Sequence, residues 1–346
     1  MKMSKYSSIG QFRNLISTVK NHTAYDGRDE NGDAIYNHSK KLPTITFTGY
    51  VKLHGTNAGI GFDGENYWVQ SRERVITIGD DNAGFAAYSL KHKAKFESIL
   101  SKIKAETDFD EIVVFGEWCG QGIQKGVGIS ELEKRYVVFA VGGVYLDEDN
   151  ESEKTYIDEY VELFNDPEIN LFNRSMFKTY SIDIDFAYPE MIVNKIVELT
   201  NEVEKECPVA KYFGVENGLG EGIVFEAKLG DSKIQFKSKG EKHSVTKVKT
   251  VVQVDPEVVQ NIYEFVEYAV TENRLEQGIT VLKENNIEIK IENMSHFIKW
   301  VSNDVIKEES DVLVANDLTY KQVGGKISQK AKEYFFDVLD KDAGLK

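Results

Sequence analysis

Short apolar segments of strand length dominate the chain between about residues 42 and 251. Two pairs of these segments flank tight-turn sequences, and each pair predicts a β-hairpin. The first pair covers residues 58–62 and 67–70, and the second covers residues 222–228 and 233–239. Further β-branched and aromatic segments predict strands over residues 44–52, 112–117 and 136–141.

Helical spacing of apolar residues appears in two segments inside this part of the chain and becomes the rule after Pro256. Residues 83–103 and 189–205 carry apolar side chains three and four positions apart. An acidic and polar stretch over residues 146–154 predicts a solvated loop. After Pro256 the helical positions are Val258, Val259, Ile262, Phe265, Val266, Ala269, Phe297, Ile298, Val301, Val305, Ala331, Phe335 and Leu339. The pattern predicts a helical C-terminal module, joined through a linker over residues 246–256.

Composition narrows the class of protein. A length of 346 residues predicts roughly two domains. The chain is 41% hydrophobic and 29% charged with only 5 prolines, which excludes collagen-like, mucin-like and wholly disordered chains. No apolar run approaches the ~20 residues of a membrane span, and the first residues carry no apolar signal core. Two cysteines form neither a disulfide framework nor a CxxC site, so we expect a cytoplasmic protein in a reducing environment.

The net charge of −15 argues by itself against a nucleic-acid partner, because duplexes are bound mainly through lysines and arginines that neutralise phosphates. Net charge is a sum over the whole chain, however, and local basic clusters can oppose it. The simplest interpretation is an acidic globular protein, and a functional hypothesis must rest on motifs.

Chemistry-bearing residues recur at the ends of the predicted strands. A lysine, Lys52, ends one strand just before Gly55, where the backbone can turn sharply. Two further lysines, Lys237 and Lys239, lie on one face of another strand by the period of two. An arginine, two carboxylates and an aromatic ring complete the set: Arg72, Glu117, Glu221 and Phe139. These side chains together suit the attack of an amine on a nucleoside triphosphate.

The order of these motifs resembles the covalent nucleotidyltransferase superfamily of ligases and capping enzymes. Within it, the chain is most similar to the bacteriophage-type RNA ligase 2 family, ATP-dependent enzymes that seal nicks in duplex RNA. The resemblance covers most of residues 1–250. It is carried by residues 5–8, 52–57, 114–117, 120–125, 136–140, 221–224 and 236–239. His54 stands where DNA ligases and capping enzymes usually have Asp, and Val51 stands where some relatives carry an acid.

The resemblance implies a role for each residue. Lys52 is the expected nucleophile, which forms a lysyl-AMP intermediate. A free lysine has a pKa of about 10.4 and is inert when protonated, so we expect Lys237, Lys239 and bound Mg²⁺ to depress it. The two lysines also hold phosphate oxygens. Glu221 faces the metal, and Glu117 accepts a hydrogen bond from the ribose.

The remaining implied roles concern AMP and the RNA ends. Arg72 binds ribose or phosphate through its planar fork, and Phe139 stacks on adenine. Val51 belongs to the nucleotide-binding set. His54 and Asn57 are expected catalytic residues, with Asn57 acting late, when the RNA ends react. No residue is assigned to RNA binding.

We therefore expect an α+β fold: an antiparallel-sheet, ATP-grasp-like nucleotidyltransferase domain over residues 1–249, then a small all-helical domain over residues 250–346. The expected protein is an ATP-dependent RNA ligase that joins 3′-hydroxyl and 5′-phosphate ends. ATP is its cosubstrate, and Mg²⁺ is its metal, with Mn²⁺ as a substitute. Its partners are RNA ends in a nicked duplex or RNA/DNA hybrid, without a membrane, and it acts as a cytoplasmic monomer (in a host cell if a phage encodes it).

Two alternatives stay open. The first is another enzyme of the superfamily, a DNA ligase or a capping guanylyltransferase. His54 argues against both, as does the lack of a recognisable OB-like strand module after Lys249. The second is a nucleic-acid-binding relative that has lost catalysis. The presence of all five expected residues argues against it: Lys52, Glu117, Glu221, Lys237 and Lys239.

Overall fold

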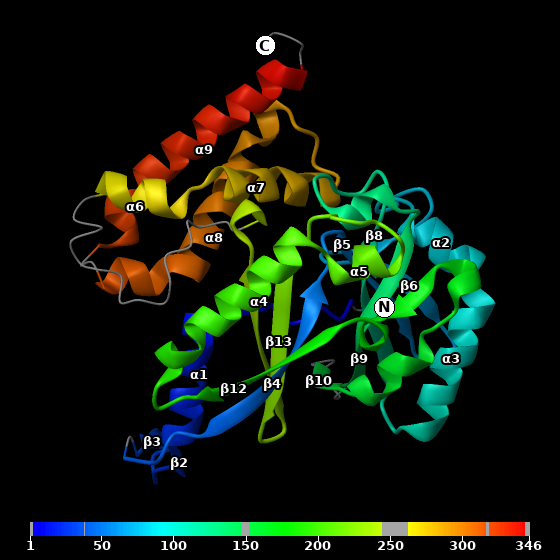
Figure 1. The fold of residues 1–346 in the computed structure, drawn as a ribbon, viewed down its shortest axis with the longest axis horizontal. Coiled ribbons are helices and arrows are strands. Elements are labelled where there is room, and N and C mark those ends of the chain that lie inside the picture. Colours follow the sequence, from blue (N-terminus) through cyan, green and yellow to red (C-terminus); the bar gives the residue numbers. More distant parts are fainter. Residues whose placement is uncertain (1–2, 38, 147–151, 244–261, 316–317, 343–346) are drawn as a thin grey trace. The chain divides into compact units, whose positions relative to one another are not determined.

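The computed structural model describes residues 3–37, 39–146, 152–243, 262–315 and 318–342. The chain divides into two compact units, each built from separate segments (Figure 1). The first, here called the sheet unit, comprises Met1–Ile9, Ile45–Ile184 and Glu198–Ser238. The second, here called the helical unit, comprises Gly10–Thr44, Asp185–Val197 and Lys239–Lys346.

The larger sheet of the sheet unit has seven strands. They are β5 (Thr56–Phe62), β6 (Tyr67–Ser71), β7 (Val75–Ile76), β8 (Glu111–Cys119), β9 (Arg135–Leu146), β10 (Ser152–Tyr156) and β11 (Leu171–Asn173). Six strands follow the order β10-β9-β8-β5-β6-β7, each antiparallel to its neighbour, and β11 pairs with β9 in parallel. The antiparallel sheet and the predicted hairpin of β5 and β6 are confirmed.

Helices α2 (Phe85–Lys91) and α3 (Lys93–Glu106) pack against this sheet (Figure 1). Phe96, Leu100 and Ile103 of α3 lie four and three positions apart and are fully buried in the shared core. The prediction of a single helix over residues 83–103 is wrong at its start and at one internal position: Ala83 and Gly84 have positive φ and precede α2. His92 has a non-helical backbone (φ −108°, ψ 17°), and the helix restarts directly after it. Hydrophobic spacing continues across such a break, so it does not reveal one.

A smaller sheet holds β4 (Thr44–Lys52), β12 (Thr179–Asp185), β13 (Gly222–Leu229) and β14 (Ser232–Lys239) in the order β14-β13-β4-β12. β13 and β4 pair in antiparallel register. The rings of Phe225 and Phe236 stack with centroids 5.0 Å apart, and Phe47 meets Phe236 edge-on at 5.6 Å. The predicted strand over residues 44–52 and the predicted hairpin of β13 and β14 are confirmed.

Both cysteines lie in a separate apolar cluster of the sheet unit that includes Leu53 and the short helix α5 (Pro208–Tyr212). Cys119 is fully buried and Cys207 is 3% exposed. Burial raises the pKa of each thiol above its ordinary value, so neither forms the reactive thiolate near neutral pH.

We therefore expect the folded protein to resist thiol reagents. A colorimetric thiol titration should give close to no reaction with the native chain and two equivalents after denaturation. Rapid reaction of one cysteine in the native chain would show that the cluster around Leu53 opens.

The helical unit contains α1 (Phe12–Ala24), α6 (Ile262–Ala269), α7 (Glu272–Glu284), α8 (Met294–Ala315) and α9 (Tyr320–Asp342). Helix α4 (Val193–Lys205) continues from a 3₁₀ turn over Pro189–Ile192, which confirms the helix predicted over residues 189–205. The short strands of this unit are β1 (Gly10–Gln11), β2 (Tyr25–Arg28) and β3 (Ala34–Tyr36). The other 3₁₀ turns among the described residues are Gly128–Glu131, Asp158–Leu163, Pro167–Ile169, Arg174–Met176, Glu241–His243 and Ile291–Asn293.

A buried ion network ties α1 to the C-terminal helices of the same unit. Arg274 is fully buried and donates to Asp304 at 2.8 Å and to Glu309 at 3.0 Å. The second oxygen of Glu309 lies 2.6 Å from Nη2 of Arg13, on α1. Removing one partner from a buried pair leaves an unpaired charge and costs about 3–5 kcal/mol. The pairing through Glu309 joins α1 to α7 and α8 within the helical unit.

The predicted loop over residues 146–154 is wrong at both ends, because Leu146 closes β9 and pairs with Ser152, the first residue of β10. Residues 147–151 lie outside the described part of the chain. The predicted linker over residues 246–256 and the predicted boundary between residues 249 and 250 lie outside the described residues. Within the described part of the chain, no helix is long and apolar enough to cross a membrane.

Candidate active site

The last residue of β4, Lys52, lies beside a buried carboxylate. In the register of β13 and β4, Gly222 pairs with Lys52, which brings Glu221 next to the lysine although the two are 169 residues apart in the chain. Lys52 Nζ lies 2.7 Å from Glu221 Oε2, and the side chain of Glu221 is only 2% exposed. His54 Nδ1 lies 3.5 Å from the same oxygen. The lysine, the histidine and the carboxylate thus form one cluster.

The expected depression of the pKa of Lys52 by Lys237, Lys239 and bound Mg²⁺ stays a prediction, and the protein's own groups set the starting value. Burial lowers the pKa of Lys52, but the carboxylates of Glu221 and Glu117 outweigh it, and the pKa lies above its ordinary value. The charge of Arg72 acts in the opposite direction and only weakly. The buried carboxylate of Glu221, 2.7 Å from the amine, therefore favours the charged form of Lys52.

The turn after Lys52 is clamped from two sides. The peptide N–H of Gly55 donates to Glu117 Oε1 at 2.9 Å, and Gln124 Nε2 donates to the carbonyl of Gly55 at 3.3 Å. In the register of β5 and β8, Asn57 lies directly opposite Glu117. Residues that face each other across a ladder point to the same side of the sheet, so Asn57 and Glu117 share the site face.

Gly55 has no room for a side chain. A Cβ at this position would lie 2.3 Å from the carbonyl oxygen of Trp118 and 2.8 Å from Cβ of Cys119. Neither the backbone of β8 nor the buried cysteine can move away easily.

We therefore expect Gly55→Ala to displace the turn that carries Lys52 and His54. Circular dichroism should show that the variant stays folded. Its rate of reaction with ATP should fall by about a hundredfold, as expected when catalytic groups are misplaced by about 1 Å. Gly79→Ala provides the control, because an added Cβ at this exposed glycine would meet no atom within 4 Å and its φ is not positive. Full activity in Gly55→Ala would contradict the rigid-turn interpretation.

Phe139 occupies a bulge in β9. Phe115 pairs with Ala140 and Gly116 pairs with Val138, so Phe139 has no partner in the ladder. Its partly buried ring packs on the same apolar cluster as Phe115, and it meets the ring of Tyr6 edge-on with centroids 4.9 Å apart. Since Phe115 and Glu117 are two residues apart on β8, the bulge places Phe139 on the side of the sheet that carries Glu117.

The other predicted residues lie on neighbouring strands. Val51 pairs with Ile223 and packs against the cluster that contains Leu53. Arg72 follows β6, with a half-exposed side chain 3.7 Å from Glu73. Lys237 lies on β14, which β13 separates from β4 in the sheet order. Lys239 closes the same strand, and its position relative to Lys52 stays a prediction.

Some site contacts were not predicted from the sequence. Tyr6 supports Phe139 from the N-terminal segment and donates to Gln235 at 2.9 Å. The similarity of residues 5–8 to the family was a signal for this segment, but nothing in the sequence linked it to Phe139. The clamp of Gly55 by Glu117 also depends on the pairing of β5 with β8, which no local pattern reveals.

Glu221 suits a hard divalent cation. The described residues contain no cluster of three or more His, Cys, Asp or Glu side chains that could enclose a metal by themselves. Mg²⁺ does not need one, since it usually keeps several waters and binds through one or two carboxylates together with substrate phosphates. A single buried carboxylate beside Lys52 fits that mode.

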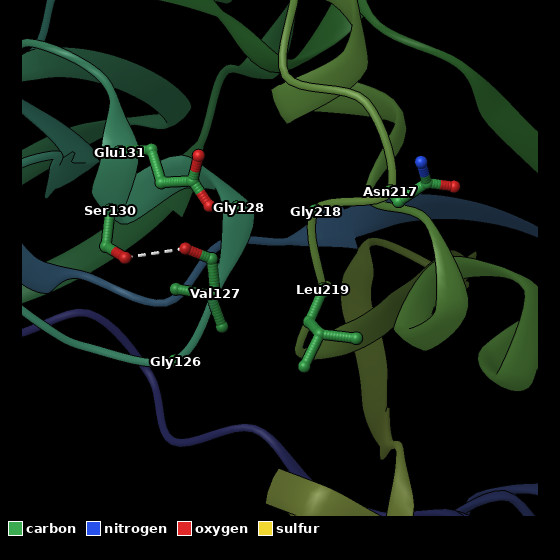
Figure 2. A pocket seen from close by; sticks show the side chains of 8 residues that line it. All are labelled: Gly126, Val127, Gly128, Ser130, Glu131, Asn217, Gly218 and Leu219. Atoms are coloured by element: carbon green, nitrogen blue, oxygen red, sulfur yellow. Dashed lines mark hydrogen bonds between the residues drawn. The ribbon is translucent and has the colours of Figure 1, made fainter.

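A cavity of about 200 Å³ opens elsewhere on the sheet unit (Figure 2). Its lining is Gly126, Val127, Gly128, Ser130, Glu131, Asn217, Gly218 and Leu219. Ser130 donates its hydroxyl to the carbonyl of Val127 at 2.6 Å, as Figure 2 shows. The lining includes a carboxylate and no cation, so this cavity does not suit a triphosphate.

Comparison with known proteins agrees with the motifs. A family model described as RNA ligase matches residues 45–249, which is more than half of the chain. The chain therefore belongs to the RNA ligase family. No curated protein matches it.

Similar solved structures include RNA ligase of Naegleria gruberi. A mutant with AMP and Mn is 16% identical, with a TM-score of 0.43, and the match covers 69% of this chain and 56% of that one. The same ligase with PPi is 16% identical, with a TM-score of 0.42 and the same coverage. The chain thus matches just over half the length of these structures.

Proposed function

We propose that this protein is an ATP-dependent RNA ligase of the RNA ligase 2 type, which seals 3′-hydroxyl/5′-phosphate nicks in duplex RNA or in RNA/DNA hybrids. The observation that carries the proposal is the pair of Lys52 and buried Glu221, 2.7 Å apart, inside the segment that the family model matches. An amine held against a carboxylate that can take a metal is what nucleotidyl transfer to lysine requires. The reaction takes place in the cytoplasm, and the protein acts as a monomer.

In the first step the neutral amine of Lys52 attacks the α-phosphorus of ATP. A P–N bond forms, the bond to the bridging oxygen breaks, pyrophosphate leaves and the amine loses a proton to solvent. Phe139 stacks on the adenine, Glu117 binds the ribose, and Val51 lies along the nucleotide. Arg72, Lys237 and Lys239 hold phosphate oxygens, where they stabilise the charge of the transition state.

A divalent cation at Glu221, Mg²⁺ or Mn²⁺, would neutralise phosphate charge and compensate the carboxylate that raises the pKa of Lys52. With its charge compensated, Glu221 would raise the pKa of Lys52 less. His54, 3.5 Å from the same carboxylate, keeps Glu221 oriented while the lysine reacts.

Two further transfers complete the reaction. The 5′-phosphate of the RNA attacks the phosphorus of lysyl-AMP, which breaks the P–N bond and frees Lys52. The 3′-hydroxyl then attacks the adenylylated 5′-phosphate, a phosphodiester forms and AMP leaves. Asn57, on the same face as Glu117, acts in this last transfer.

Labelling and ligation assays test the proposal. The protein is incubated with ATP or GTP radiolabelled on the α-phosphate, and then with a nicked RNA duplex, a single-stranded RNA and a nicked DNA duplex. We expect a covalent label from ATP alone and the fastest joining on the RNA duplex. Labelling by GTP would identify a capping enzyme, preference for the DNA nick would identify a DNA ligase, and no label from either would identify an inactive relative.

A further inference from the structure

The first half of α9 is basic in an otherwise acidic protein. Between Tyr320 and Lys332 the helix carries four lysines and no Asp or Glu, whereas the whole chain has a net charge of −15. The lysines are Lys321, Lys326, Lys330 and Lys332. A local concentration of positive charge of this kind attracts polyanions even when the rest of the surface repels them.

The lysines of α9 divide between two sides of the helix. Val323, Ile327 and Ala331 are fully buried and define the side that faces the core of the helical unit. On one flank, Lys330 lies 2.8 Å from Glu267 of α6, which neutralises it. The opposite flank carries Lys321, Gly325 and Lys332, at the four- and seven-residue spacing of one helical stripe. We call these three residues the lysine face.

The charges of the lysine face are available to a ligand. Lys321 and Lys332 are exposed, and neither forms an ion pair with any carboxylate of the described residues. Lys332 Nζ lies 5.9 Å from the centroid of the Phe336 ring, one turn further along the helix. At 1.5 Å per residue, the two lysines stand about 16 Å apart along the axis.

Gly325 lies between these lysines, and neither helix stability nor packing requires a glycine there. Glycine in the middle of a helix is destabilising relative to alanine. A Cβ at Gly325 would meet no atom within 4 Å, so packing does not require its absence. The missing side chain does allow an extended polymer to approach the helix backbone between the two lysines.

We propose that the lysine face of α9 binds the phosphate backbone of the RNA duplex that this enzyme seals. The inference rests on the proposed function and deepens it, because it names residues that hold the substrate. A-form duplexes are recognised mainly by shape and through phosphate and 2′-hydroxyl contacts. The two unpaired lysines can each contact a phosphate of one RNA strand, and the open stretch of helix between them leaves room for that strand.

A double variant tests the two charges. Binding of a nicked RNA duplex is measured by fluorescence anisotropy over a range of salt concentrations, for the unaltered chain and for Lys321→Ala/Lys332→Ala. Each lost phosphate contact lowers the slope of log K against log salt by about one, so we expect a decrease of about two and roughly tenfold weaker binding at low salt. The matched control is Lys283→Ala/Lys299→Ala, which removes two exposed lysines from α7 and α8.

The outcomes are distinct. Equal weakening by both double variants would mean that net charge, not the lysine face, governs binding, and it would overturn the inference. Unchanged affinity and slope in Lys321→Ala/Lys332→Ala would overturn it as well. Lysyl-AMP formation by the unaltered chain without RNA tests the proposed function separately, so the inference can fail while the proposed function stands.

Gly325 gives a second test with two effects of opposite sign. Gly325→Ala should raise the melting temperature, because alanine favours the helix, and should weaken RNA binding severalfold, because the methyl group occupies the path of the backbone. Gly79→Ala, in an exposed turn of the sheet unit, is the control for a glycine substitution outside the face. A more stable variant with unchanged RNA affinity would exclude close approach at this position.

Discussion

Lys52→Ala is expected to lower the rate of lysyl-AMP formation by on the order of 10⁴-fold or more, which is the usual effect of removing a covalent nucleophile. In the proposed mechanism the amine of Lys52 forms the bond to phosphorus, and this amine lies 2.7 Å from Glu221. Labelling with ATP radiolabelled on the α-phosphate measures the loss directly. The same variant should still seal a nick whose 5′ end is already adenylylated, since that transfer needs no nucleophile from the protein.

Lys52→Arg separates the nucleophile from the ion pair. Arginine keeps a positive charge beside Glu221 but cannot be deprotonated in a protein. We expect this variant to melt near the temperature of the unaltered chain and to form no lysyl-AMP. Lysyl-AMP in either variant would show that another amine is the nucleophile.

Glu221→Gln is expected to slow lysyl-AMP formation by about 10²- to 10³-fold, the usual effect of removing one group that stabilises transition-state charge. The amide keeps the shape of the side chain but loses the charge that would hold a metal. The loss should be partly recovered at high Mg²⁺ or Mn²⁺ concentration. Glu216→Gln, at an exposed position five residues earlier in the chain, should leave the rate unchanged.

Whether Glu221→Gln reacts more slowly or faster distinguishes two roles for Glu221. Glu221 raises the pKa of Lys52, so its removal lowers that pKa and leaves more neutral amine at a given pH. If Glu221 did no more than hold Lys52, the variant would react faster than the unaltered chain. A slower reaction therefore supports a role for Glu221 toward the metal and phosphates, and a faster one would contradict it.

Local patterns predicted most of the elements that frame the site. Strand-length apolar segments located β4, β5, β8, β9, β13 and β14, and turn sequences located both hairpins, because the alternation of side chains follows from backbone geometry. Helix α1 was not predicted, although Phe12, Leu15 and Val19 lie at helical spacing and are buried. Local patterns did not predict the division into two units, because it depends on long-range contacts. The pairing of Arg13 with Glu309, for example, joins residues 296 positions apart.

The sequence alone determined which chemical groups are present and which element carries each of them. It identified Lys52, Glu117, Phe139 and Glu221 through their motifs. Only the tertiary structure decided how these groups act on each other. The register of β13 against β4 places Glu221 at Lys52 and holds the pKa of Lys52 above its ordinary value, because burial and the distance between charges are properties of the assembled sheet.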